Sequence, residues 1–401
     1  AGRPRRMACC WSRVAEGLLP PSKDSDFDRQ VLVAFGKVLD AGGVVRTSPG
    51  NIQRRNLTGT LGIVVQFSSE HFNKKRTPPG SISQQVVAAV DPEAFNFSKV
   101  DPAEKLLEIE AIPREHPDGG LCATVLVNVS PLATGHVLFV PNCDEVRPQV
   151  LTEHLLLGGL NLLAMSTRHD FRLVFNSLMG FASVNHFHFH GLYLNYCGLQ
   201  DARLPMEKAE RSIIAGGITE GRVALELLVE GKWYVRGFVV TAGCAKGTPG
   251  ANPPADVAAL ASLAYRVVLE LQKRNIAHNV VLAPPSGRKP KRAPQALQAL
   301  ASEEVVKPEA LSPEIYILPR QPEGSLREDA GFNAAVMELA GLIVARSEET
   351  FKSLSEESVQ EIFKSDVSIP DSVFDELICK ASLRRRELLD WRTRSLHACM
   401  R

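Results

Sequence analysis

Apolar residues recur at helical spacing in several long stretches of the chain. The stretches 29–39, 149–166 and 257–274 each place apolar residues three or four positions apart, which is the spacing of an amphipathic helix. The last sixty or so residues follow the same pattern, for example between Val373 and Ala381. We therefore predict helices in these three stretches and a mainly helical C-terminal part.

Other stretches are rich in β-branched and aromatic residues and are bounded by Gly, Pro or Ser, which is typical of strands. The predicted strands cover residues 57–67, 121–129, 136–140, 171–176, 185–196, 279–282 and 315–318, and residues 225–240 predict an antiparallel hairpin around Glu230, Gly231 and Lys232. Because strands and helices are mixed and hairpins are expected, the sequence predicts an α+β fold.

Two segments differ from this pattern. Residues 1–27 are basic at their start and have no helical or strand periodicity, so they are expected to form a disordered basic tail. Residues 284–313 contain the basic stretch 288–292 followed by an acidic stretch, and are expected to form a long mobile insertion. The remaining chain, from residue 28 to residue 401, is expected to fold as a single unit.

Composition narrows the class of protein. The 401 residues are 44% apolar and 23% charged, which is ordinary for a globular protein with a sizeable core. The formal net charge of +1 gives no global reason to expect nucleic acid or an anionic membrane as partner, and no apolar run is long enough to span a bilayer. None of the eight Cys lies in a C-x-x-C pair, which favours reduced thiols and a cytoplasmic location.

Three histidines alternate with two phenylalanines at His186, Phe187, His188, Phe189 and His190. On a strand, side chains two residues apart point to the same face. The pattern therefore predicts three imidazoles on one face and two rings anchored in the core on the other.

Three interpretations of this run are compared. Structural histidines would need polar partners for three rings on one face. A metal site could use the His-x-His spacing, although no Cys or carboxylate flanks the run, and we predict no metal and no cofactor. Nucleophilic attack on a phosphate uses the neutral imidazole that exists near pH 7, with neighbouring imidazoles as donors.

The segment directly before the run favours the phosphate interpretation. Residues 176–185 hold small and polar residues, among them Asn176, Gly180, Ser183 and Asn185, on a predicted turn. Such a turn can present backbone N–H groups and hydroxyls to a phosphate. We therefore predict a phosphate-binding site formed by this turn and the histidines.

The run resembles the His-φ-His-φ-His-φ-φ motif of the histidine-triad superfamily, with Gly191 at an apolar position of that pattern. Gly180 and Ser183 resemble the Gly-x-x-Ser stretch ahead of the nucleophile in its galactose-1-phosphate uridylyltransferase branch. The wider chain is similar to the GDP-hexose phosphorylases, and His190, where other branches have Gln, favours those that act on GDP-D-glucose. The similar segments, in chain order, are residues 73–78, 95–100, 128–132, 135–138, 176–178, 275–279, 319–320 and 333–341.

This resemblance implies an antiparallel sheet flanked by helices in one catalytic unit, built from two histidine-triad-like halves (about residues 28–240 and 241–401), of which only the first carries the triad. It also implies that His188 attacks the α-phosphorus of a GDP-hexose, that His186 orients its ring, and that His190 bonds the phosphate. Inorganic phosphate would then release GDP from the guanylyl-histidine. The substrate-binding residues implied or predicted are Arg76, Lys75, Asn176, Ser183, Asn185, Gly180 and Arg320.

Several alternatives stay open at this point. The same intermediate could be hydrolysed by water, which would make the chain a histidine-triad nucleotide-sugar or dinucleotide hydrolase, and a regulatory protein with a relic site is a third interpretation. His136 is interpreted as a core residue, whereas His278 and Asn279 either face the substrate or close a loop. A homodimer is compatible with the sequence.

Overall fold

The computed structural model describes most of the chain. The described residues are 25–70, 83–114, 116–117, 119–199, 201–214, 223–242, 257–285, 291–292 and 312–381. Residues 1–24 of the predicted tail, the candidate residues Lys75 and Arg76, and most of the predicted insertion lie outside them.

The fold is α+β and is built on an 11-stranded sheet with the order β12-β8-β9-β10-β13-β11-β6-β7-β5-β4-β3. All neighbouring strands in it are antiparallel except β12 and β8. In chain order the strands are β3 (Lys105–Ile112), β4 (Leu121–Val127), β5 (Val137–Pro141), β6 (Phe171–Asn176), β7 (Phe189–Tyr193), β8 (Arg211–Ile213), β9 (Val223–Leu228), β10 (Phe238–Ala242), β11 (Ala277–Ala283), β12 (Lys291–Arg292) and β13 (Glu314–Arg320).

The sheet consists of two similar halves that meet where β6 pairs with β11. Along the chain, the first half runs β3-β4-β5-α4-β6-β7 and the second runs β8-β9-β10-α5-β11-β13. From the central pair outward, the order is β6-β7-β5-β4-β3 on one side and β11-β13-β10-β9-β8 on the other. We therefore infer that the halves divide between β7 and β8, earlier than the expected boundary at residue 240.

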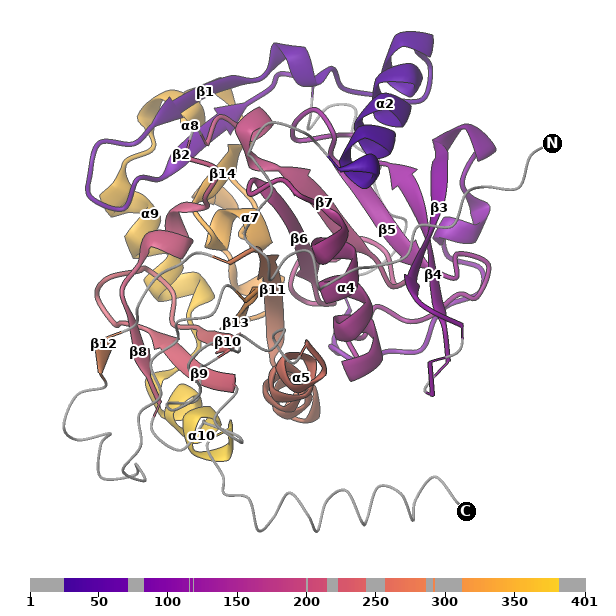
Figure 1. Ribbon diagram of the computed structural model, residues 1–401. Helices are drawn as coiled ribbons and strands as arrows, with labels where there is room; N and C mark the ends of the chain where they lie inside the picture. The colour runs from indigo at the N-terminus through magenta and orange to yellow at the C-terminus, as the bar shows by residue number, and fades with distance from the viewer. Residues whose placement is uncertain are drawn as a thin grey trace, which may run out of the picture.

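Helices cover one face of the large sheet (Figure 1). These are α2 (Asp26–Ala41), α4 (Glu153–Met165), α5 (Val257–Lys273) and α10 (Asp371–Ala381), and their buried residues share one core with the strands. The opposite face packs against a three-stranded sheet of β1 (Gln53–Asn56), β2 (Val64–Phe67) and β14 (Leu342–Ala345), together with α7 (Val336–Leu339), α8 (Glu348–Ser353) and α9 (Glu356–Ile362).

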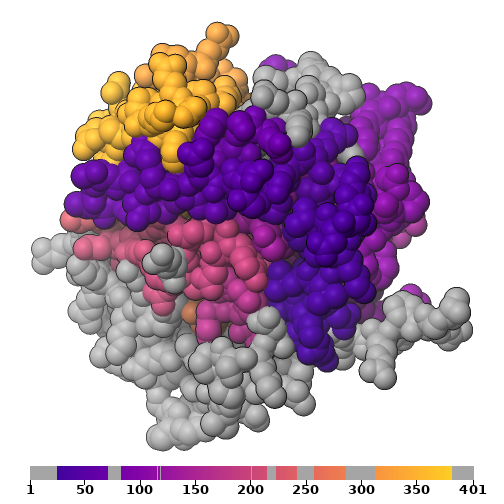
Figure 2. All heavy atoms as spheres, turned by 90° about the horizontal axis from the view of Figure 1, so that it is seen from above, coloured from indigo at the N-terminus to yellow at the C-terminus, as the bar shows by residue number. Residues whose placement is uncertain are grey.

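This smaller layer joins distant parts of the chain. β2 pairs antiparallel with β1 and parallel with β14, which follows it by almost 280 residues. Arg55 of β1 donates to the carbonyl oxygens of Phe351 and Leu354 at 2.5 and 2.7 Å. Figure 2 shows the result, with the indigo N-terminal segments lying along the yellow C-terminal ones.

The structure corrects several predicted boundaries. α2 begins at Asp26 and not at residue 29, because the Ser25 side chain caps it by accepting a hydrogen bond from the Asp28 amide. Of the predicted strand 57–67 only β2 is a strand, and residues 57–63 connect it to β1, its hairpin partner. The predicted strand 185–196 is shortened to β7. β3, β8 and β14 were not predicted, because their alternation is weak or their length is only three or four residues.

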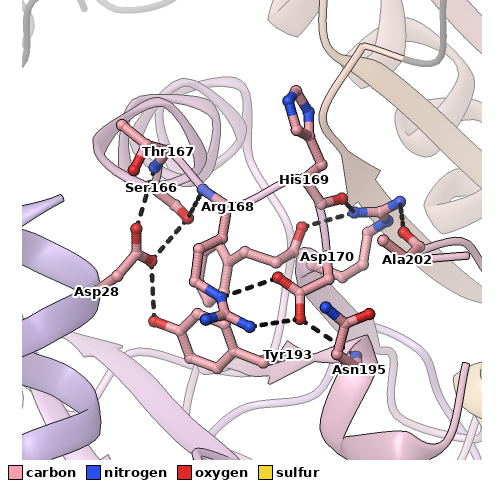
Figure 3. A network of polar contacts seen from close by, with 11 residues as sticks. Asp28, Ser166, Thr167, Arg168, His169, Asp170, Tyr193, Asn195 and Ala202 are labelled. Carbon is pink, nitrogen blue, oxygen red and sulfur yellow. Dashed lines mark hydrogen bonds and ion pairs between the residues drawn. The ribbon is translucent and has the colours of Figure 1, made fainter. Parts of the chain in front are cut away.

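A buried polar network fixes the far end of β7 (Figure 3). The Asp28 carboxylate of α2 accepts hydrogen bonds from the Tyr193 hydroxyl at 3.0 Å, the Ser166 hydroxyl at 2.7 Å and the Thr167 amide at 3.0 Å. Burial raises the pKa of Asp28, although these donors oppose the shift. The network therefore ties α2, the end of α4 and the strand that carries the histidine run into one rigid unit.

No helix in the described part of the chain combines the length and apolar character that crossing a membrane requires.

Candidate active site

The histidine run enters β7 from an irregular segment. Only Phe189 and His190 of the run belong to the strand, whereas residues 186–188 precede it. Phe187 and Phe189 are fully buried in the helix-covered core and pack against Phe175, with ring centroids 5.6 and 6.2 Å away. The predicted division holds, since His188 and His190 lie on the other side with ring centroids 5.0 Å apart.

His188 has a defined tautomer. Its Nδ1 lies 2.8 Å from the carbonyl oxygen of His186, and because a carbonyl can only accept, Nδ1 carries the proton. Nε2 therefore has the lone pair, and no described residue forms a hydrogen bond to it. Burial lowers the pKa of His188 to about 4, so the ring is neutral at pH 7. A neutral imidazole with an unoccupied Nε2 on a cavity wall is a competent nucleophile.

His186 supports His188 and does not line the cavity. Its Nδ1 accepts a hydrogen bond from the Phe97 amide at 3.0 Å, and its ring is fully buried. Burial and the neighbouring His188 lower the pKa of His186 to about 4. Its carbonyl fixes the His188 ring, and its own ring fixes the segment that contains Phe97, whose ring centroid is 4.9 Å from that of His188.

A fourth histidine belongs to the site. The Leu132 amide donates to Nδ1 of His136 at 3.0 Å, so the proton of the neutral His136 ring lies on Nε2. That nitrogen is 3.0 Å from Nδ1 of His190, which therefore accepts, and His190 carries its own proton on Nε2. His136 is buried, as the core interpretation expected, but it also lines the cavity. The core interpretation is confirmed, and the place of His136 at the cavity adds to it.

The turn before the run is held by the second half. Nδ2 of Asn279 on β11 donates to Oδ1 of Asn176 at 2.6 Å and to the Gly180 carbonyl at 2.8 Å. The Val336 amide at the start of α7 also donates to Oδ1 of Asn176, at 3.0 Å. Of the two interpretations of Asn279, the structure supports loop closure. A side chain at Gly180 would place its Cβ 2.9 Å from the Ser177 hydroxyl, which explains the glycine.

The predicted substrate-binding residues separate into three groups. Asn176 and Ser183 line the cavity. Gly180, Asn185 and Arg320 do not. The Gly180 carbonyl accepts from Asn279, and the Arg320 guanidinium bonds two backbone carbonyls, although its Nη2 has no partner among the described residues. Nδ2 of Asn185 donates to the Ala89 carbonyl at 2.9 Å. Lys75 and Arg76 lie outside the described residues.

Arg320 is almost fully buried beside the cavity. Its guanidinium donates to the carbonyl oxygens of Ala334 and Gln321 and stacks on the Phe181 ring, 5.0 Å from the centroid. Burial lowers the pKa of Arg320 to about 10. Arg320 therefore positions the segment that leads into α7.

The cavity has a volume of about 310 Å³ and lies across the histidine strand. One part of the wall is formed by the segment that contains Phe95, Phe97 and Glu104, and a second part by Asn333 and residues 335–338. The lining also includes His136, His188, His190, Asn128 and Ser130. The Ser130 hydroxyl is buried there and has no partner among the described residues, which marks it as a donor for a bound molecule. No local pattern indicates Ser130 or Asn128 as site residues beyond their place in a similar segment.

Gly191, which departs from the motif, also has a structural reason. A Cβ at this position would lie 2.5 Å from the Phe139 ring of the neighbouring strand β5, so only glycine fits. In the described part of the chain, no group of three His, Cys, Asp or Glu side chains is arranged to hold a metal ion.

The repeated sheet and the histidine-bearing strand define a protein of the histidine-triad type. The structure is similar to that of yeast Ap4A phosphorylase Apa2 in complex with Ap4A, with a TM-score of 0.52 and 15% identity over 86% of this chain and 99% of that one. The complex of the same enzyme with AMP gives a TM-score of 0.50 and 16% identity over 85% and 96% of the two chains. At this identity the likeness concerns the fold.

Family models identify the chain more closely. Residues 26–192 match the N-terminal domain and residues 205–383 the C-terminal domain described as GDPGP1-like, so the chain belongs to the GDPGP1-like family. It is 31% identical to GDP-D-glucose phosphorylase 1 of Danio rerio over 80% of this chain and 81% of the relative. The Bos taurus protein of the same name is 30% identical over 94% and 89%. GDP-L-galactose phosphorylase 1 of Arabidopsis thaliana is 26% identical over 84% and 70%.

Proposed function

We propose that the protein is a GDP-D-glucose phosphorylase that works through a guanylyl-His188 intermediate. The observation that carries the proposal is the neutral His188 ring, whose Nδ1 is bonded to the His186 carbonyl and whose Nε2 is unoccupied at the cavity. The relatives named GDP-D-glucose phosphorylase 1 support the choice of substrate.

The reaction has two steps. Nε2 of His188 attacks the α-phosphorus of GDP-glucose, the bond to the bridging oxygen breaks, and glucose 1-phosphate leaves with that oxygen. An oxygen of inorganic phosphate then attacks the same phosphorus, the P–N bond breaks, and GDP leaves. The proton on Nδ1 stays with the ring, and the His186 carbonyl stabilises the positive charge that the guanylylated imidazole carries.

The transition state spreads negative charge over the phosphoryl oxygens and requires fixed donors. His190 supplies Nε2–H because His136 holds its tautomer. Asn176 and Ser183 supply further polar groups on the cavity wall. We assign the cationic contribution to Arg76 and Lys75, as the family resemblance implies.

The two walls suit the two parts of the substrate. Phe95 and Phe97 offer aromatic faces beside His188, which favour a planar base. Asn333 and Glu338 on the second part of the wall offer hydrogen-bonding groups for sugar hydroxyls. Because the walls come from different halves, residues 28–401 are proposed to act as one catalytic unit.

Intact-mass spectrometry after incubation with GDP-glucose in the absence of phosphate tests the proposal. The wild-type chain should gain one guanylyl group, the His188→Ala variant should gain none, and added phosphate should remove the group and release GDP. Release of GMP without phosphate would instead identify a hydrolase. Absence of the adduct in the wild-type chain would contradict the intermediate.

A further inference from the structure

The ladder between β6 and β7 opens at the nucleophile. These strands pair from Phe171 with Tyr193 up to Val174 with His190. Continued in this register, the ladder would pair Phe175 with Phe189 and then Asn176 with His188. That pair is missing, since β7 begins at Phe189. The His188 backbone therefore has to find its hydrogen bonds elsewhere.

The side chain of Gln149 supplies them. Oε1 of Gln149 accepts from the His188 amide at 2.9 Å, while Nε2 donates to the His188 carbonyl at 3.3 Å and to the Asn176 carbonyl at 2.9 Å. Gln149 is 1% exposed, and its backbone amide donates to Oδ1 of Asn185 at 2.9 Å. One carboxamide thus takes the place of a ladder pair, with Asn185 holding it.

The second half of the sheet offers a comparison within the same molecule. We relate the two halves about the central pair of Val174 with Val281, which joins β6 to β11. In this alignment Leu138, His190 and Val174, paired across β5, β7 and β6, match Val239, Tyr316 and Val281, paired across β10, β13 and β11.

Two residues further along, the two halves differ. The second half keeps its ladder, because Ala283 is paired with Glu314. In the first half the corresponding residues, Asn176 and His188, are separated by the carboxamide of Gln149. The opening is therefore not a property of the fold and accompanies the histidine nucleophile.

We propose that Gln149 is a positioning residue for His188. It holds the nucleophile's backbone outside the regular ladder, so that the His188 ring can bond the His186 carbonyl through Nδ1 and turn Nε2 to the cavity. The catalytic part of this inference, the effect on the reaction of His188, rests on the proposed function. The role needs both an acceptor and a donor on one side chain, which only a carboxamide combines at this size.

The test compares the variants Gln149→Leu and Gln149→Glu with wild type in the single-turnover reaction of GDP-glucose without phosphate. Gln149→Leu should slow formation of the His188 adduct by about 100-fold, the effect of a small misplacement of a reacting group, with little change in the GDP-glucose concentration that gives half the maximal rate. Gln149→Glu should be slow at pH 7.5, because its carboxylate faces two carbonyl oxygens. It should recover toward wild type at pH 5, where the protonated acid can donate again. The matched control is Gln321→Leu. It removes a hydrogen bond from the Gln321 carboxamide to the Ser368 carbonyl, away from the histidines.

Two results would overturn the inference. They are adduct formation at the wild-type rate in Gln149→Leu, and a Gln149→Glu rate that does not rise relative to wild type as the pH falls. If the wild-type chain itself forms no adduct, the proposed function fails, and nitrogen NMR of labelled histidine still decides the inference. Wild-type His188 should then be protonated at Nδ1, whereas Gln149→Leu should show a mixture of tautomers, and an unchanged signal would exclude the positioning role.

Discussion

Nε2 of His136 lies 3.0 Å from Nδ1 of His190, and this contact joins the residue directly before β5 to the last histidine of the run. Because the Leu132 amide occupies the other nitrogen of His136, the direction of the hydrogen bond is set. The bond leaves His190 with its proton on Nε2, as a donor.

Replacing His136 by Phe should therefore impair the reaction more than the fold. The ring volume is kept, but His190 loses the partner that fixes its tautomer, and we expect the rate of adduct formation to fall about 10- to 100-fold, as for the loss of an orienting partner. Single-turnover kinetics on GDP-glucose measure this, and His169→Phe, at an exposed histidine, is the control. A rate within twofold of wild type would show that His190 needs no partner.

The rate of the first step should fall on the acid side only at a pH far below the usual pKa of histidine. Burial lowers the pKa of His188 to about 4, so its Nε2 lone pair is available above that pH and is lost as the pH falls through 4. Adduct formation without phosphate is the suitable assay, because phosphate itself titrates near neutrality. The rate should stay level from pH 7.5 to about pH 5, and a midpoint near 6.5 would contradict the buried environment.

The same shifts make folding stability depend on pH. His186, His188 and His278 each have a pKa lowered by burial to about 4, whereas the unfolded chain binds protons near pH 6.5. Their contribution is thus fully present above pH 6.5 and is lost as the pH falls toward 4. Urea unfolding at pH 7.5, 6 and 5 should show falling stability.

Local pattern was enough to predict the parts of the fold that depend on long periodic stretches. β6 has the predicted bounds, and α5 ends one residue before the predicted end. The alternation of the histidine run also assigned Phe187 and Phe189 to the core correctly, since two-residue spacing fixes the face even where the ladder is open.

The rest of the site depends on contacts that no local pattern contains. Helical spacing predicts that a helix begins at Gln149, but α4 begins at Glu153 after the cap Thr152. The Gln149 side chain can therefore reach His188, 39 residues away. Asn185 looked like a ligand residue because it is polar and precedes the run. In the folded chain its amide is used by Gln149 and the backbone of residues 88 and 89.

The rings behind the histidines should dominate local stability. Phe189 is 1% exposed and packs against Phe187 with centroids 5.1 Å apart, so Phe189→Ala should lower the free energy of unfolding by about 3–5 kcal/mol. Urea unfolding measures this, with Val33→Ala at a half-exposed position of α2 as control. A loss below about 1 kcal/mol would mean that the run is not anchored through this face.

A substitution in the buried polar network of the second half should lower stability without lowering the rate of the reaction. Tyr316 occupies the place that corresponds to His190, and its hydroxyl donates to Glu314 at 2.7 Å. Glu314 also accepts from the buried Arg211, with an N–O distance of 3.1 Å. β13 contains no histidine, and this ion-paired network stands where the first half has its histidines.

Glu314→Ala should therefore act on stability and not on the reaction. Removing Glu314 leaves the buried Arg211 charge with Glu226 alone, 3.4 Å away, and takes the acceptor of the Tyr316 hydroxyl. We expect a loss of about 3 kcal/mol in the free energy of unfolding, the lower end for a broken buried ion pair. The exposed pair of Glu348 and Lys352 provides the control, since solvent screens an exposed ion pair and Glu348→Ala should leave the free energy of unfolding almost unchanged. Below the unfolding transition, Glu314→Ala should form the His188 adduct at nearly the wild-type rate, because its network lies on β13 and β8, away from the cavity walls. A large loss of rate in the folded variant would show that the second half takes part in the reaction through this network.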